Sequence, residues 1–310
     1  MLDYDKEAGA YDATRGGEPR AEAAADAVLS LIPDSIGSAG STGGAGSVGG
    51  ADGAGSAGNA GTAGSVGGAE GPARRDRAGS PDRDGSPVHA GRPSRPGRLL
   101  DLACGTGIVT RRLAAARPAL QVTGVDRAPG MARMAAVRLP PGSVLLADSR
   151  RLPFPDATFD VVTTVWLLHL MADGTEVRGI VAECARVLRP GGVYVTTVDK
   201  AAAHDVGSDI DAVLAARPRR PASDAAAEVR AYALANGLLP AGQAAFAGVG
   251  QGRSPRSTLA DLRRGWFTML PPDDPRTEDF ARRLAALPDQ DRRRPDPRFA
   301  VRAFRKPAAC

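Results

Sequence analysis

The sequence contains few of the residues that form disulfide bonds or bind structural metals. It has 3 cysteines and 3 histidines in 310 residues, and none of the cysteines forms a Cys-X-X-Cys pair. This excludes a disulfide framework and argues against a zinc site. No apolar run approaches the ~20 residues of a membrane helix, and the acidic N-terminus MLDYDKEAGAYD lacks a signal-peptide core. We therefore expect a cytoplasmic protein with no membrane span and no metal site.

Lysine is also scarce, so arginine supplies nearly all of the positive charge. The only lysines are Lys6, Lys200 and Lys306, and the formal net charge is +5. The excess is uneven, because seven arginines and three aspartates fall within 72–98 and the remaining chain is close to neutral. A coding bias explains this distribution better than a binding surface does. We expect no specific nucleic-acid partner.

The composition divides the chain into four stretches. Residues 1–36 hold a helix and a segment expected to cover the ligand pocket. Residues 37–97 are first rich in glycine, with 15 glycines among the 35 residues of 37–71, and then rich in arginine and proline. We interpret them as a disordered insert within the domain. Residues 98–200 are expected to form the core of the domain, and 201–310 its second half.

The segment RLLDLACGTGIVTRRL, residues 98–113, organises the chain. Its apolar run over 99–103 suits a strand that is buried on both faces. Gly105 and Gly107 then turn the chain into a helix over 108–116. Glycine lets a ligand lie against bare backbone, and a helix N-terminus offers free N–H groups to it. This strand, turn and helix predict a ligand site.

Two acids make that site specific for a nucleoside. Asp101 stands just before the glycine turn, and Asp126 ends the next apolar strand, 19 residues beyond Gly107. An acid near that spacing holds the two ribose hydroxyls in Rossmann-type units. Thr110 occupies the place of the third glycine of a dinucleotide fingerprint, which disfavours NAD.

Strands and helices alternate through the core, which predicts a doubly wound parallel sheet. We expect strands at 120–125, 143–147, 159–165 and 193–198, and helices at 128–139 and 174–188. Beyond residue 200 the pattern predicts short helices and two strand-like runs. The helices are expected at 205–216, 223–236, 257–270 and 277–287, and the strand-like runs at 243–249 and 299–304.

Three blocks in register carry a family resemblance. The block DLACGTG (101–107) with VTGVD (122–126), the block DSRRLPFPDATFDVV (148–162) and the block RVLRPGG (186–192) follow one another in the core. Together they resemble class I S-adenosylmethionine-dependent methyltransferases, in particular the small-molecule branch that includes quinone-biosynthesis enzymes. Ala103, where many members carry glycine, and the insert are departures from the family pattern.

The resemblance implies a fold and a reaction. The fold is a Rossmann-like, doubly wound, mostly parallel seven-stranded sheet with helices on both faces and an antiparallel edge strand, to which 243–249 and 299–304 contribute. The reaction is metal-free, in-line transfer of a methyl group from S-adenosyl-L-methionine to an O, N or C atom of a small molecule. The alternatives are a nucleotide-cofactor oxidoreductase and a non-catalytic S-adenosylmethionine-binding protein.

The resemblance also assigns roles to individual residues. Asp101 would attract the ammonium group of the donor, Asp126 would accept the ribose hydroxyls, and Asp148 would accept the adenine amino group. His169 is the candidate general base. The remaining expected cofactor contacts lie in the glycine turn, after the second and third strands, at the end of the fourth strand and near the N-terminus: Ala103, Cys104, Gly105, Gly107, Arg127, Ser149, Thr164, Val165, Tyr11 and Arg15.

Overall fold

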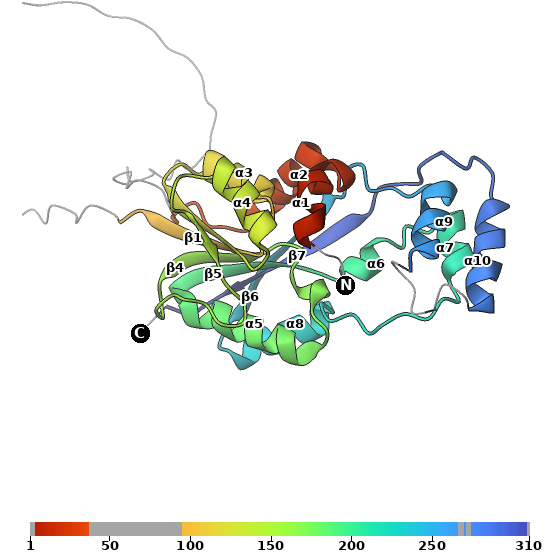
Figure 1. The fold of residues 1–310 in the computed structure, drawn as a ribbon. Helices are drawn as coiled ribbons and strands as arrows, with labels where there is room; N and C mark the ends of the chain where they lie inside the picture. The colour runs from red at the N-terminus through yellow and green to blue at the C-terminus, as the bar shows by residue number, and fades with distance from the viewer. Residues whose placement is uncertain (1–3, 37–94, 266–269, 271–273, 309–310) are drawn as a thin grey trace, which may run out of the picture. The chain divides into compact units, whose positions relative to one another are not determined.

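A seven-stranded sheet forms the centre of the computed structural model, which describes residues 4–36, 95–265, 270 and 274–308. The strand order is β3-β2-β1-β4-β5-β7-β6, and β7 runs antiparallel to both of its neighbours (Figure 1). The other pairs are parallel. The predicted Rossmann-like fold is confirmed. The strands are β1 (Gly97–Leu102), β2 (Leu120–Asp126), β3 (Val144–Leu146), β4 (Phe159–Thr164), β5 (Leu188–Val198), β6 (Leu239–Ala247) and β7 (Arg298–Arg305).

Helices cover both faces of the sheet (Figure 1). On one face α5 (Gly174–Val187) and α8 (Ala226–Ala235) pack their apolar sides, including Ile180 and Ala233, against the strands. On the other face lie α2 (Gly17–Leu29) and α3 (Ile108–Ala116), through Val28 and Leu113. The strands buried between them are almost wholly apolar, as a two-sided parallel sheet requires. All described residues belong to one compact unit.

The structure differs from the sequence prediction at both ends of the core. The chain begins with a helix, α1 (Tyr4–Thr14), which the acidic N-terminal segment did not predict. It packs against α4 (Pro129–Arg138), where Asp5 accepts the backbone N–H of Gly130 at 2.5 Å. The predicted insert reached residue 97, yet Gly97 already belongs to β1 and Arg95 pairs with Asp160 at 3.0 Å. Residues 37–94 lie outside the described residues.

The fifth strand starts earlier than its apolar run suggested. The sequence RPGG (189–192) was expected to end the preceding helix, but it lies inside β5, which begins at Leu188 directly after α5. The register between β4 and β5 shifts between Phe159 and Val161. Gly191, at φ 83°, donates its N–H to the carbonyl of Lys306 at 2.8 Å, so pairing extends through the glycines. A strand can thus contain this turn-like sequence when a bulge absorbs it.

A separate helical group follows β5. The short helix α6 (Lys200–Ala203) leads to α7 (Asp209–Leu214), which packs with α9 (Pro255–Arg263) and α10 (Pro275–Ala285) (Figure 1). These three helices share a hydrophobic cluster of their own, in which Ile210, Leu262 and Phe280 are buried. They correspond to three of the four predicted C-terminal helices: α7 and α9 are shorter than predicted, and α10 has the predicted length but begins two residues earlier. The group forms a small second core within the unit.

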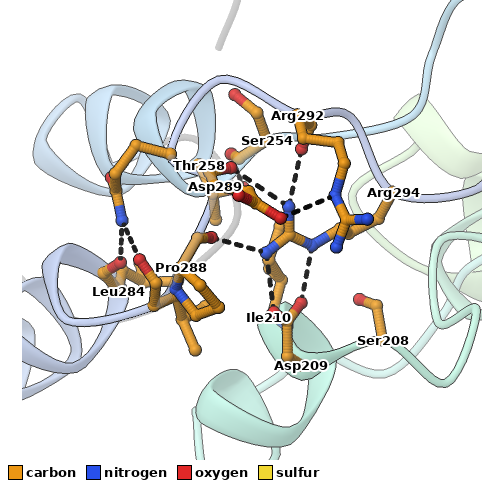
Figure 2. A network of polar contacts seen from close by, with 12 residues as sticks. Ser208, Asp209, Ile210, Ser254, Thr258, Leu284, Pro288, Asp289, Arg292 and Arg294 are labelled. Atoms are coloured by element: carbon orange, nitrogen blue, oxygen red, sulfur yellow. Dashed lines mark hydrogen bonds and ion pairs between the residues drawn. The ribbon is translucent and has the colours of Figure 1, made fainter.

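Arg294 holds this helical group together (Figure 2). Its side chain is 7% exposed and pairs with Asp209, the first residue of α7, at 2.6 and 2.7 Å. The remaining guanidinium N–H groups donate to the carbonyls of Pro288, Asp289 and Arg292 at 2.7 to 3.3 Å. One guanidinium therefore donates hydrogen bonds to the carbonyls of the loop after α10 and to the carboxylate at the N-terminus of α7. Its planar donor set suits this role better than a lysine would.

Replacing Arg294 with methionine should destabilise the protein. The substitution removes the guanidinium donors from Asp209 and from three carbonyls, although Asp209 keeps the backbone N–H of Ile210 and the carbonyl of Asp289 keeps that of Arg292. We expect a cost of about 2 kcal/mol of unfolding free energy. Thermal unfolding measures the loss as a Tm several degrees lower. The matched control is Arg292→Met, because the Arg292 side chain is 69% exposed. An equal Tm for the two variants would contradict the assignment.

Candidate functional site

A cavity opens at the carboxyl edge of the parallel strands. It encloses about 1300 Å³ of space, part of it continuous with solvent. Its walls come from the segments that follow β1, β2, β3 and β4 and from the two N-terminal helices. The side chains discussed below that line it are Tyr11, Arg20, Asp101, Ala103, Cys104, Gly105, Asp126, Arg127, Asp148, Ser149, Arg150, Val165, Trp166 and Glu176. The open edge of a doubly wound sheet is where such folds bind ligands.

Asp101 lies in β1 at the floor of the cavity and is 3% exposed. Its two carboxylate oxygens accept hydrogen bonds from the hydroxyls of Thr110, at 2.5 Å, and Thr163, at 2.7 Å. Burial raises the pKa of Asp101 to about 6, and the two hydroxyls oppose the shift. A buried carboxylate whose hydrogen-bond partners here are two neutral hydroxyls lowers the stability of the fold, and a cationic ligand group would offset that cost.

The glycine turn serves two different purposes. Gly105 has φ 57°, and a Cβ added there would meet nothing within 4 Å, so the turn leaves open space beside it. Gly107 has φ 77° and does not line the cavity; a Cβ there would lie 3.0 Å from the backbone and the side chain of Ala135. Gly105 therefore frees room for a ligand. Gly107 instead allows α3 to begin close against α4.

The residues between β1 and the turn also have structural roles. Ala103 adopts φ 54°, a left-handed conformation that favours glycine. Cys104 is 8% exposed, and its sulfur would lie 2.9 Å from a Cβ on Gly124. Burial raises the pKa of the Cys104 thiol, so it remains protonated and unreactive. Both residues shape the cavity wall through packing.

Asp126 connects the end of β2 to the glycine turn through hydrogen bonds. Its Oδ2 accepts the backbone N–H of Gly105 at 2.8 Å, and its Oδ1 accepts that of Ala128 at 2.9 Å. Burial raises the pKa of Asp126, while these backbone N–H groups oppose the shift. Each carboxylate oxygen has a second lone pair available for a ligand hydroxyl. Arg127 beside it also lines the cavity, as predicted.

The region after β3 contains an ion-pair chain that the sequence did not reveal. Asp148 and Ser149 line the cavity, and Asp148 pairs with Arg150 at 2.7 Å. Arg150 pairs in turn with Glu176 of α5, also at 2.7 Å. Neither partner was predicted, because Glu176 lies in a different element and only the fold brings it to Arg150. The Arg150 side-chain hydrogen bond lowers the pKa of Asp148 and keeps it ionised.

Thr164 faces away from the cavity that Val165 lines. Its hydroxyl lies in the core, 2.8 Å from Tyr194 and 2.7 Å from Thr196. The strand alternation explains this, since its neighbour Thr163 points toward Asp101 instead. Trp166, which was not predicted, lines the cavity with φ 58° and donates its backbone N–H to Thr197 at 2.7 Å. Such strain in a bulky residue often marks a functional position.

His169, the predicted base, is not among the residues that line the cavity. It lies in the short helix Leu168–Leu170, and its Nε2 is 3.0 Å from Nζ of Lys200. Burial and the charge of Lys200 hold the pKa of His169 well below its usual range, so the ring is neutral. A neutral imidazole can accept a proton, but here Lys200 already occupies its accepting nitrogen.

The N-terminal helices contribute one predicted and one unpredicted lining residue. Tyr11 lines the cavity, whereas Arg15 does not; its guanidinium carbon lies 5.9 Å from the centre of the Tyr11 ring. Arg20 of α2 lines the cavity too, with its guanidinium 4.1 Å from the centre of the Trp166 ring. Asp12 of α1 accepts the hydroxyl of Thr106 in the glycine turn at 2.7 Å. These contacts link α1 and α2 to the site.

Within the described ranges, no group of three metal-binding side chains occurs. A search of the same residues finds no helix with the length and apolarity to cross a membrane.

Comparisons with known proteins place the core of the chain in one class. Residues 100–196 match the family model described as a methyltransferase domain. Over 100 residues the chain is 38% identical to the demethylmenaquinone methyltransferase of Thermotoga maritima, which covers 32% of this chain and 42% of that protein. Over 104 residues it is 42% identical to the protein of the same name from Thermus thermophilus, covering 32% and 46%. The chain thus spans less than half of the length of these relatives.

A solved structure matches about a third of the chain. It is the structure of S-adenosylmethionine-bound CalS10, an amino pentose methyltransferase from Micromonospora echinaspora. Its identity to this chain is 35% and its TM-score is 0.30, and the match covers 33% of this chain and 42% of that one.

Proposed function

We propose that the chain transfers a methyl group from S-adenosylmethionine to a small molecule, because residues 100–196 match the model of a methyltransferase domain. The observation that carries the proposal is the cavity itself. It gathers Asp101, Gly105, Asp126 and Asp148 at one edge of the sheet. The nucleotide-cofactor oxidoreductase is disfavoured, because the match is to methyltransferases. The cytoplasmic location and the assignment of the acceptor to small molecules stay predictions.

The residues of the cavity fit the donor group by group. Asp101 is a buried carboxylate that needs a cation, which the ammonium of the methionine moiety supplies. Asp126 keeps a free lone pair on each oxygen for the two ribose hydroxyls. Open space beside Gly105 leaves room for the backbone of that moiety. Asp148, 42% exposed and ionised, is placed to accept the adenine amino group.

The chain's contribution to the reaction is orientation. S-adenosylmethionine supplies the methyl group on a sulfonium, which is already an activated leaving group. The protein therefore has to hold the acceptor atom in line with the methyl–sulfur bond and exclude water, which supplies on the order of 7–11 kcal/mol. Val165 and Trp166, at the end of β4, provide apolar wall for this purpose. The acceptor gains the methyl group and loses a proton to solvent or to a base.

Two measurements test the proposal. Calorimetry with S-adenosylhomocysteine and with NAD determines which of the two the cavity binds. Micromolar binding of NAD, without binding of S-adenosylhomocysteine, would overturn the assignment. Transfer of a labelled methyl group to a metabolite panel then separates an enzyme from a protein that only binds the donor. Donor binding without transfer to any member of a broad panel would favour the binding protein.

Replacing His169 with glutamine should have only a modest effect on turnover. A general base contributes about 10²–10⁴-fold, but His169 does not line the cavity and its Nε2 is bonded to Lys200. We expect turnover to fall less than about 100-fold with donor affinity unchanged. We also expect the variant to keep the shape of the wild-type pH–rate profile, because the pKa of His169 is lowered well below its usual range. A loss above about 10³-fold would make His169 an essential base.

A further inference from the structure

Four nitrogen-bearing side chains meet where the ends of β4 and β5 approach α2. Trp166 and His169 follow β4, Lys200 follows β5, and Arg20 belongs to α2. Arg20 and Trp166 line the cavity and are in cation–π contact, while His169 and Lys200 are 3.0 Å apart. Leu167 and Leu170, on either side of His169 in the chain, line the cavity as well. We call these four residues the donor cluster.

The donor cluster has hydrogen-bond donors without acceptors. Within the described part of the chain, Nε of Arg20, Nε1 of Trp166 and Nδ1 of His169 are buried and have no hydrogen-bond partner. The first two can only donate. A lysine ammonium has no lone pair, so Nε2 of His169 accepts from Lys200 and the ring proton resides on Nδ1. All three orphan groups are therefore donors, and each costs free energy until an acceptor reaches it.

The cluster also carries uncompensated positive charge. Burial lowers the pKa of Lys200 to about 8, and the nearby charges of Arg15 and Arg20 act in the same direction. The carboxylate that opposes them is Asp224, which accepts the backbone N–H of Lys200 at 2.8 Å rather than its ammonium. Arg20 has a side-chain hydrogen bond with Tyr11, and Asp12, whose charge also raises the pKa of Arg20, is already paired with an arginine of α4 at 2.7 Å. Among the described residues, no carboxylate forms an ion pair with Arg20 or Lys200.

We propose that the methyl acceptor carries an anionic oxygen group, such as a carboxylate, which binds to Arg20 and Trp166 in the cavity wall. Its binding depends also on the positive charge of Lys200, which does not line the cavity but is close enough to Arg20 for the two charges to interact. This inference rests on the proposed methyltransferase function. A carboxylate offers about four lone-pair sites, enough to satisfy several of these donors at once, and its charge offsets that of the two cations. The carboxylate of the donor's own methionine moiety has the same chemistry, so the test must distinguish the two sources.

Matched pairs of acids and amides provide the test. The probes are benzoate with benzamide, 4-hydroxybenzoate with 4-hydroxybenzamide, and indole-3-acetate with indole-3-acetamide, titrated by calorimetry into protein saturated with S-adenosylhomocysteine. Each pair keeps the shape and changes only the charge. We expect the wild-type protein to bind the acid of at least one pair about tenfold more tightly than its amide, as a charge-assisted bond predicts. No preference in any pair overturns the inference.

Variants of Lys200 assign the preference to the cluster. Lys200→Met should abolish it, Lys200→Arg should restore most of it, and Arg230→Met, which removes a charge from an exposed position in α8, should leave it intact. S-adenosylhomocysteine affinity should stay within about twofold throughout, which also reports that the variants fold. A tenfold loss of that affinity in Lys200→Met would assign the anion to the donor and overturn the inference. Failure of the wild-type protein to bind S-adenosylhomocysteine would instead remove the proposed function.

Discussion

Asp126→Ala should weaken the binding of S-adenosylhomocysteine about 30- to 1,000-fold. The ribose diol would lose a bidentate, charge-assisted acceptor, which corresponds to roughly 2–4 kcal/mol of binding free energy. The substitution also leaves the backbone N–H groups of Gly105 and Ala128 without their acceptor, so the glycine turn itself loosens. Titration calorimetry at a temperature where the variant is folded measures the loss.

The control for this experiment is Asp26→Ala, since Asp26 is an exposed aspartate on α2. It removes one carboxylate from the same protein, and its affinity should match the wild type. An affinity within twofold of wild type for Asp126→Ala would remove Asp126 from the site. A lowered Tm with unchanged affinity would limit Asp126 to holding the turn.

Asp101→Asn should make the empty protein more stable while making it a poorer binder. The ionised Asp101 carboxylate is buried against two hydroxyls, and a pKa raised to about 6 from 3.8 means that ionisation works against the folded state. That cost is at most about 3 kcal/mol at neutral pH. Asparagine keeps the shape and can bond to both threonines, so we expect a gain of about 1–2 kcal/mol in unfolding free energy. S-adenosylhomocysteine binding should weaken at least about tenfold, because the ammonium loses its counter-charge.

The pH dependence gives this prediction a definite sign. Below about pH 4 the Asp101 side chain is protonated in both the folded and the unfolded states, so its ionisation does not lower the free energy of unfolding. In the folded protein Asp101 keeps its proton up to about pH 6. The loss of stability caused by its ionisation therefore grows between about pH 4 and pH 6 and is constant at higher pH. The stability difference between Asp101→Asn and wild type should therefore increase from pH 4 to about 6.5 and then level off. His169 and His204 titrate in both proteins and cancel in the difference. A variant less stable than wild type at pH 7 would mean that the hydroxyls stabilise the charge.

The order and type of the core elements could be predicted because each leaves a local pattern. The apolar runs of β1, β2 and β4 are continuous, and the glycine turn marks where α3 begins. The helix α1 left no such pattern, because tertiary contacts hold it: Asp12 pairs with Arg138 at 2.7 Å. The early start of β5 was hidden by the RPGG sequence, which reads locally as a helix end. Only the pairing with β4 and β7 makes it a strand.

The residues of the site also fall into two groups, those that local motifs predict and those that only the fold brings together. Asp101, Gly105 and Asp126 belong to short motifs with fixed spacing, so the sequence alone brings them together. Arg20, Trp166 and Lys200 come from three distant segments, and their proximity depends on the parallel order of β4 and β5 and on the packing of α2. Thr164 was assigned to the cavity from its position at the strand end, whereas alternation along β4 directs Thr163 toward Asp101 and Val165 into the cavity wall.

The position of β7 has a consequence for how the chain acquires its structure. β7 is the final strand of the described chain, yet it lies between β5 and β6 and provides hydrogen-bond partners for both. Until the ribosome has released residues 298–305, β5 has an open edge and β6 has no partner in the sheet. Exposed strand edges pair readily with other chains, and contacts this distant in sequence form slowly. The nascent protein therefore passes through a stage in which it is vulnerable to aggregation, and this stage ends only when β7 joins the sheet.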